Sequence, residues 1–153
     1  MKTADCGFKD LGNLTGSRHL QYTGPTLAVD IGFDPAYHSG IDEKPPVPSA
    51  RGLGALVDTG AQNCCIDATL AMQLQLPIID QIQVCGVDGT SKKNVHMAQV
   101  YVPALDYTIM GHFVGADLTG GGQPHQAILG RDFLKHFKLI YDGRTGKVVI
   151  QDA

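Results

Sequence analysis

The sequence lacks the segments that would insert it into a membrane or mark it for export. No apolar run approaches the roughly 18 residues that a membrane-spanning helix requires. The first ten residues, MKTADCGFKD, contain no apolar stretch of the kind found in signal peptides. We therefore expect a cytoplasmic protein without a membrane span.

The chain also lacks an excess of basic charge. Its 12 Lys and Arg residues are outnumbered by 15 Asp and Glu residues, which gives a net charge of −3. Nucleic acids and anionic membranes are attracted by basic surfaces, so neither is an expected partner. At 153 residues, with 43% hydrophobic and 18% charged residues, the chain is long and apolar enough to build its own core.

Cysteine and histidine are too scattered to indicate a metal site or a disulfide framework. The four cysteines show no CxxC spacing, and the six histidines form no HExxH pattern. Without an export signal, the cysteines are expected to be free thiols. We expect no metal and no cofactor. A thiol-based redox or metal protein that uses Cys64, Cys65 and Cys85 is a minor alternative.

Glycine and proline, in contrast, are abundant, with 19 and 8 residues. This composition favours short strands joined by tight turns over long helices. Apolar alternation and short apolar runs predict strands at 26–33, 52–57, 78–84, 94–102, 108–114, 127–129, 139–142 and 147–150. Short helices are predicted after Asp67, which can act as an N-cap, and around residues 133–137. The predicted fold is all-β with one or two short helices.

Two stretches fall outside this pattern. Residues 1–25 show no sustained periodicity and are predicted to be an N-terminal arm before a single domain at 26–153. Residues 34–51 contain four prolines and a polar run, which predicts a long exposed loop. Three interpretations of this loop are open: a border of a substrate groove, a site of self-processing, and a tolerated insertion, which is the default. At residues 87–90, Asp-Gly between two extended runs predicts a hairpin.

A carboxylate follows directly on a short apolar strand, in the sequence Asp58-Thr59-Gly60-Ala61. A carboxylate at the end of a buried strand must be hydrogen-bonded, paired or protonated, because isolated burial is costly. Gly60 permits a close backbone approach that a Cβ would prevent. An ordinary turn remains the alternative, since this tripeptide alone is weak evidence of catalysis.

Several motifs in order along the chain strengthen the catalytic interpretation. They are ALVDTGA at 55–61, LAMQLQLP at 70–77, VCGVDGTSKKNVHMAQV at 84–100 and AILGRDFL at 127–134, before a terminal FKLIYDGRTGKVVI. Over residues 26–150 the sequence resembles the retropepsin-like aspartic proteases, the single-domain branch of the pepsin clan. The resemblance implies a closed β-barrel of the acid-protease type, active as a twofold dimer.

The same resemblance implies an aspartic endopeptidase without a cofactor. The chemistry requires two carboxylates that share one proton, and a homodimer would supply Asp58 twice. One carboxylate would activate a water while its protonated partner hydrogen-bonds the scissile carbonyl of an extended peptide. Thr59 of each subunit would lock the two loops together, and Gly60 would leave room for the substrate backbone.

Two further groups of residues take roles by this resemblance. The turn of the predicted hairpin would belong to a flap that closes over the peptide. Substrate contacts would come from Ala61, Val87, Asp88 and Gly89. Support of the catalytic loop from behind would come from Ile128, Leu129, Gly130 and Arg131.

The sequence departs from the family pattern at Gln62, where viral members carry an Asp that pairs with the arginine. We therefore expect Arg131 to bond Asp132 or a backbone carbonyl instead. A catalytically silent relative can also retain Asp-Thr-Gly. A dimeric peptide- or protein-binding domain of the same fold is therefore the main alternative to an enzyme.

Overall fold

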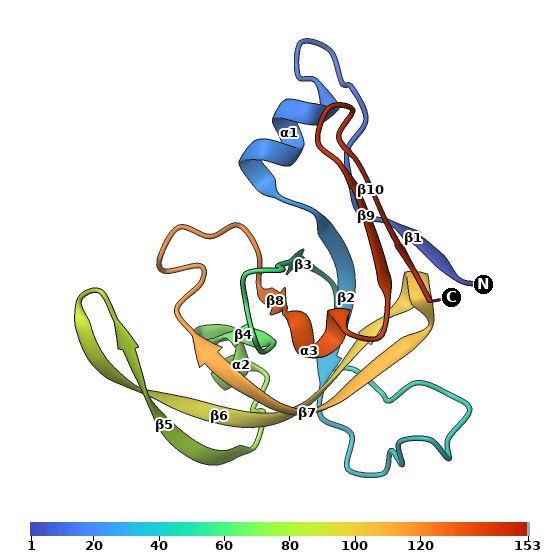
Figure 1. Cartoon of the computed structure of the whole chain (residues 1–153). Helices are drawn as coiled ribbons and strands as arrows, with labels where there is room; N and C mark the ends of the chain where they lie inside the picture. The colour runs from blue at the N-terminus through green and yellow to red at the C-terminus, as the bar shows by residue number, and fades with distance from the viewer. Residues whose placement is uncertain (153) are drawn as a thin grey trace.

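Strands dominate the computed structural model, which describes residues 1–152 (Figure 1). In chain order the elements are β1 (Thr3–Asp5), α1 (Gly16–Thr23), β2 (Thr26–Gly32), β3 (Ala50–Val57), β4 (Cys65–Asp67), α2 (Ala68–Gln73), β5 (Ile78–Gly86), β6 (Gly89–Val102), the 3-10 helix η1 (Pro103–Leu105), β7 (Tyr107–Ala116), β8 (Ala127–Leu129), α3 (Arg131–Leu134), β9 (Lys138–Asp142) and β10 (Lys147–Gln151). The prediction of an all-β fold with short helices is confirmed.

Six of the strands close into a barrel. Neighbours around the ring are β2, β3, β8, β4, β7 and β6, and β6 pairs back onto β2. The pairs β3–β8 and β4–β7 are parallel, whereas the others are antiparallel. Closure leaves these strands without a free edge along their paired lengths and encloses the core.

The alternation read in the sequence explains why β2 forms part of the barrel wall. Leu27, Val29 and Ile31 are buried, while the side chains between them face outward or are half-buried. The following loop is shorter than predicted. β3 begins at Ala50, so residues 50–51 belong to that strand and the loop spans residues 33–49.

The predicted hairpin is present and extends from the barrel. β5 pairs only with β6, and all nine of its residues are exposed. The chain reverses at Val87-Asp88, and Gly89 has a φ of 108°, a conformation that glycine adopts at little cost. Figure 1 shows this hairpin reaching out on one side of the molecule.

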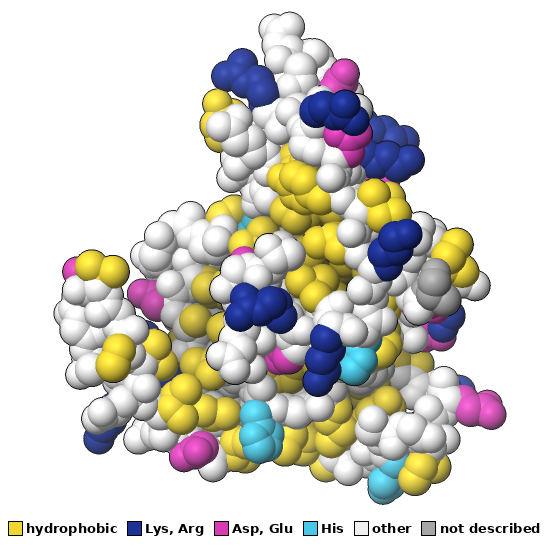
Figure 2. All heavy atoms as spheres, in the orientation of Figure 1, with side chains coloured by type: hydrophobic (Ala, Val, Ile, Leu, Met, Phe, Trp, Pro, Cys, Tyr) yellow, Lys and Arg dark blue, Asp and Glu magenta, His cyan; other side chains and the backbone are white. Residues whose placement is uncertain are grey.

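Residues 1–25 contain elements that the sequence analysis did not predict. β1 pairs with β10, and β10 pairs with β9, so the two ends of the chain form a separate three-stranded sheet. The termini lie side by side, because the Lys2 amide donates to Asp152 Oδ1 at 2.7 Å. Hydrophobic side chains fill the junction of this sheet with the barrel, and both contribute to one buried cluster (Figure 2).

The helices are short and begin at recognisable caps. Asp67 accepts a hydrogen bond from the Leu70 amide, as predicted for the start of α2. Thr15 caps α1 in the same way, and Gly24 ends it just before Pro25. Both cap signals are present in the sequence, but α1 was not predicted, because no apolar period accompanies them. Within residues 1–152, no helix is long and apolar enough to cross a membrane.

Candidate active site

The loop that carries Asp58 begins where β3 ends. The Asp58 amide donates to the Leu129 carbonyl at 3.0 Å, which ties the loop to β8. The Asp58 carboxylate accepts a hydrogen bond from the Gly60 amide at 2.8 Å. Asp58 is half-buried, whereas Thr59 and Gly60 are exposed. The loop therefore orients the carboxylate and presents it at the surface of the chain.

Glycine at position 60 matches this tight geometry. A Cβ there would lie 3.1 Å from Asp58 Oδ1, closer than most side-chain contacts allow. Any larger residue would press on the carboxylate oxygen that the Gly60 amide binds. A side chain at position 60 would therefore require the Asp58 carboxylate to shift by a few tenths of an ångström.

β8 lies next to β3, at whose end the Asp58 loop begins. It lies parallel to β3, with Leu56 opposite Ile128 and Val57 opposite Leu129. At Gly130 the chain passes directly against the loop, because a Cβ there would lie 2.8 Å from the Asn63 carbonyl. Only glycine fits at this crossing without displacing backbone.

Arg131 holds the loop with two hydrogen bonds. Its amide donates to the Ala61 carbonyl at 2.8 Å. Its guanidinium Nη1 donates to the Thr59 carbonyl at 2.7 Å. Of the two partners expected for Arg131, the structure shows a backbone carbonyl. A charged donor on a carbonyl gives a strong hydrogen bond, so the backbone on both sides of Gly60 is restrained.

A second bridge to the loop, between Cys64 and Asp132, was not predicted. The Cys64 amide donates to Asp132 Oδ2 at 3.1 Å, and its thiol donates to Oδ1 at 2.9 Å. Burial and the hydrogen bond to Asp132 raise the pKa of the Cys64 thiol far above its ordinary value. The sequence contained no signal for this contact, because a cysteine and an aspartate at this separation form no local motif.

The predicted flap turn is not brought together with the Asp58 loop within one chain. Val87 is fully exposed at the tip of the β5–β6 hairpin. Figure 1 shows this tip standing clear of β8 and α3. The structure therefore places Asp58, Thr59, Gly60 and Ala61 against Ile128, Leu129, Gly130 and Arg131, and leaves Val87, Asp88 and Gly89 apart.

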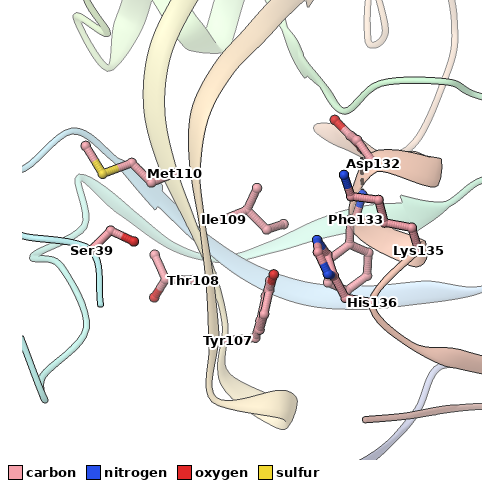
Figure 3. Close-up of a pocket in the computed structure, with 9 residues that line it drawn as sticks. All are labelled: Ser39, Tyr107, Thr108, Ile109, Met110, Asp132, Phe133, Lys135 and His136. Carbon is pink, nitrogen blue, oxygen red and sulfur yellow. Dashed lines mark hydrogen bonds between the residues drawn. The ribbon is translucent and has the colours of Figure 1, made fainter. Parts of the chain in front are cut away.

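A hollow of about 330 Å³ lies elsewhere, between β7 and the residues of and just after α3 (Figure 3). Its lining residues are Ser39, Tyr107, Thr108, Ile109, Met110, Asp132, Phe133, Lys135 and His136. None of the predicted site residues lines it, and both Asp132 carboxylate oxygens accept hydrogen bonds from Cys64. The Asp58 loop is therefore distinct from this hollow.

The cysteines and metal-binding side chains bear on the alternative of a thiol-based redox or metal protein. All four cysteines lie within residues 1–152 and are free thiols, with Cys6 and Cys64 buried and Cys85 exposed. In the same part of the chain, no group of three or more His, Cys, Asp and Glu side chains is placed to hold a metal ion. The Asp58 loop is thus the best-formed candidate site.

Comparisons with known proteins bear on this site. A family model described as gag-polyprotein putative aspartyl protease matches residues 50–136, more than half of the chain. Among solved structures, the Simian Foamy Virus (mac) protease is 13% identical, with a TM-score of 0.46, and the match covers 72% of this chain and 91% of that one. The EIAV protease, complexed with the inhibitor HBY-793, is 21% identical, with a TM-score of 0.45 and coverages of 72% and 85%. No curated protein matches the chain.

Proposed function

The chain belongs to the gag-polyprotein putative aspartyl protease family, and on this premise we propose that it is an aspartic endopeptidase that works as a homodimer. The observation that carries the proposal is the restrained loop around Asp58. Its carboxylate is oriented by the Gly60 amide, and the loop backbone is held by Arg131. Catalytic groups must be fixed in this way, because small misplacements are costly to the rate.

The need for a second copy follows from the chemistry. Hydrolysis of a peptide bond by carboxyl groups requires one ionised and one protonated carboxyl, and the chain has one Asp-Thr-Gly. Thr59 and Gly60 are exposed beside Asp58. This exposure allows two such loops to meet across a twofold axis, so that each subunit supplies one carboxyl group.

The catalytic cycle uses a water as the nucleophile. The ionised Asp58 of one subunit takes a proton from this water, while the protonated Asp58 of the other donates a hydrogen bond to the scissile carbonyl oxygen. Attack forms a tetrahedral intermediate, and proton transfer to the leaving amine breaks the C–N bond. No covalent bond to the enzyme forms. Because one carboxyl must stay protonated, activity is expected to be highest at mildly acidic pH.

The substrate is proposed to be an extended peptide beneath the β5–β6 hairpin. An extended peptide can bind by main-chain hydrogen bonds, and its successive side chains then point into pockets on opposite sides of its backbone. The exposure of all nine β5 residues, and of Val87 at the tip, leaves this hairpin available to close over such a peptide. Closure would exclude water from the reacting bond.

Digestion of a peptide library by the purified protein, followed by mass spectrometry, tests the proposal. Wild-type protein should cleave, Asp58→Asn should not, and sedimentation velocity should show both as dimers. Glu43→Gln, an exposed acid in the 33–49 loop, is the matched control and should cleave normally. Cleavage by Asp58→Asn would refute the mechanism. Binding of a statine-type inhibitor without any cleavage by wild type would favour a silent binding domain.

A further inference from the structure

The loop between β2 and β3 contains an ordered proline-rich segment. Figure 1 shows this loop on the side of the barrel away from the β5–β6 hairpin. Its residues 44–48 read Lys-Pro-Pro-Val-Pro. Proline fixes its own φ near −65° and biases the preceding residue toward extended backbone. This segment therefore favours the polyproline II conformation.

The segment is anchored to the barrel at defined points. The Val47 amide donates to Asp34 Oδ2 at 3.0 Å, and the Ser49 amide donates to the Ile31 carbonyl at 2.9 Å. Asp34 is itself held by the buried Gln99 side chain, which bonds both its amide and its carbonyl. A buried side chain, Gln99, thus fixes the start of this loop, which a loop that was only a tolerated insertion would not require.

The pattern of exposure matches one side of a polyproline II helix. With three residues per turn, Pro45 and Pro48 share one edge, and Lys44 and Val47 share another. Pro46, on the third edge, is buried. Lys44 and Pro45 are exposed, Pro48 is half-buried, and the Val47 side chain is 70% exposed. The fold thus buries the edge that carries Pro46 and leaves the other two edges of the segment accessible to solvent.

The backbone of the segment is also free to accept hydrogen bonds. Among residues 1–152, no donor bonds a carbonyl oxygen of residues 44–48. Aromatic-lined grooves recognise polyproline II segments through two exposed edges, packing rings against the prolines. Tryptophan N–H and tyrosine O–H groups in such grooves can donate to the free carbonyls.

We propose that residues 44–48 are a docking site for the aromatic groove of a proline-recognition domain of the SH3 or WW type. The exposed cation Lys44 suits a groove with an acidic rim, whereas the Arg51 guanidinium, although 74% exposed, already pairs with Asp30 at 3.7 Å. The segment is separate from the Asp58 loop. The proposal therefore stands independently of the proposed peptidase activity.

A fluorescence titration tests this docking site directly. The chain contains no tryptophan, so the groove tryptophans of purified SH3 and WW domains report binding without background. We expect at least one domain of such a panel to bind the 153-residue chain that carries Asp58→Asn, chosen to avoid cleavage of the probe, with a Kd below about 100 μM. Replacing both prolines, Pro45→Ala with Pro48→Ala, should weaken that binding at least about tenfold.

Pro35→Ala is the matched control, because Pro35 is an exposed proline of the same loop outside the segment. It should bind like the parent. Thermal melting establishes whether the Pro45→Ala, Pro48→Ala double variant folds. If it does not fold, Lys44→Glu and Val47→Glu test the other exposed edge of the segment. We expect each of them to weaken binding by the same factor. The proposal is overturned if no domain binds with a Kd below about 100 μM, if the variants bind unchanged, or if only an isolated 42–52 peptide binds.

Discussion

The guanidinium of Arg131 donates a hydrogen bond to the carbonyl oxygen of Thr59, with 2.7 Å between Nη1 and the oxygen. The bond joins the start of α3 to the loop that carries Asp58, across 72 positions of sequence. Arg131 is thus a positioning residue, because it restrains the loop through its backbone without reaching the carboxylate. The loop geometry therefore depends on a side chain outside the Asp-Thr-Gly motif.

Replacing this side chain tests that role. If Asp58 is catalytic, we expect Arg131→Ala to lower kcat/KM at least about tenfold, because the loop loses a restraint next to the Asp58 carboxylate. The free energy of unfolding should fall by only about 1 kcal/mol, since the side chain is exposed. Arg131→Lys should recover part of the activity by keeping a cationic donor. Arg144→Ala, which removes an exposed cation from the β9–β10 turn, should leave kcat/KM unchanged.

The crossing at Gly130 predicts a steric effect. Gly130→Ala would place a Cβ 2.8 Å from the Asn63 carbonyl, so the loop must shift. We expect the free energy of unfolding to fall by at least about 2 kcal/mol, measured by urea denaturation, and peptide cleavage to be lost. Gly54→Ala, in the adjoining strand β3, has no contact closer than 3.7 Å and is the control. Equal stability of the two variants would contradict this packing.

The proposed flap predicts a change in substrate binding without a change in stability. Val87 is fully exposed in the chain, so Val87→Ser should leave the melting temperature unchanged. If the hairpin closes over the peptide, the same variant should raise KM severalfold. Ile41→Ser removes a comparably exposed apolar side chain from the 33–49 loop and should leave KM as it is. An unchanged KM for Val87→Ser would show that the turn of the β5–β6 hairpin does not contact the substrate.

If the two subunits of a dimer share one pair of Asp58 carboxyl groups, the activity of mixtures of wild type and Asp58→Asn should fall more steeply than the fraction of wild type. When equal amounts of wild type and Asp58→Asn exchange subunits, only dimers with two Asp58 residues can cleave. The activity should then be about one quarter of that of the same total amount of wild type. An active monomer would instead give about one half. Titrating the ratio of the two proteins and fitting the curvature decides between them.

The buried thiols predict selective labelling. Burial raises the pKa of Cys6 to about 12, and burial with the Asp132 hydrogen bond raises that of Cys64 further. Both stay protonated at pH 8, and the thiolate is the reactive form. A thiol reagent should therefore modify the exposed Cys85 in the folded chain, and Cys6 and Cys64 only after unfolding. Peptide mapping by mass spectrometry identifies the modified positions.

The thiols of Cys6 and Cys64 also predict that the free energy of unfolding falls at alkaline pH. Above about pH 9 the unfolded chain loses these thiol protons while the folded chain retains them. The folded state then binds more protons, so the free energy of unfolding should decrease as pH rises from about 9 toward 12. Urea denaturation at pH 8 and pH 10 measures this slope. Combining Cys6→Ala with Cys64→Ala should make the slope smaller, and Cys65, whose pKa burial also raises, accounts for part of what remains.

Local features were predictable because they depend on residues only a few positions apart. The alternation of Leu27, Val29 and Ile31 predicted β2, and Asp67 predicted the start of α2. Asp88-Gly89 predicted the hairpin in the same way. The helix α1 was missed although Thr15 and Gly24 mark its ends, because no apolar period supports it. Its stability comes from packing Leu20 into the core, which no local pattern reveals.

The amino-acid order alone determined the strands, the turns and the motif around Asp58, because backbone preference and side-chain periodicity act over short distances. Only the tertiary structure decided that β3 lies parallel to β8, that Cys64 bonds Asp132 across 68 positions, and that the two ends of the chain share one sheet. Such contacts form when distant segments bury their apolar faces together. The pairing of these segments depends on the closing of the barrel and on the packing of the terminal sheet against it, and neither can be read from one segment alone.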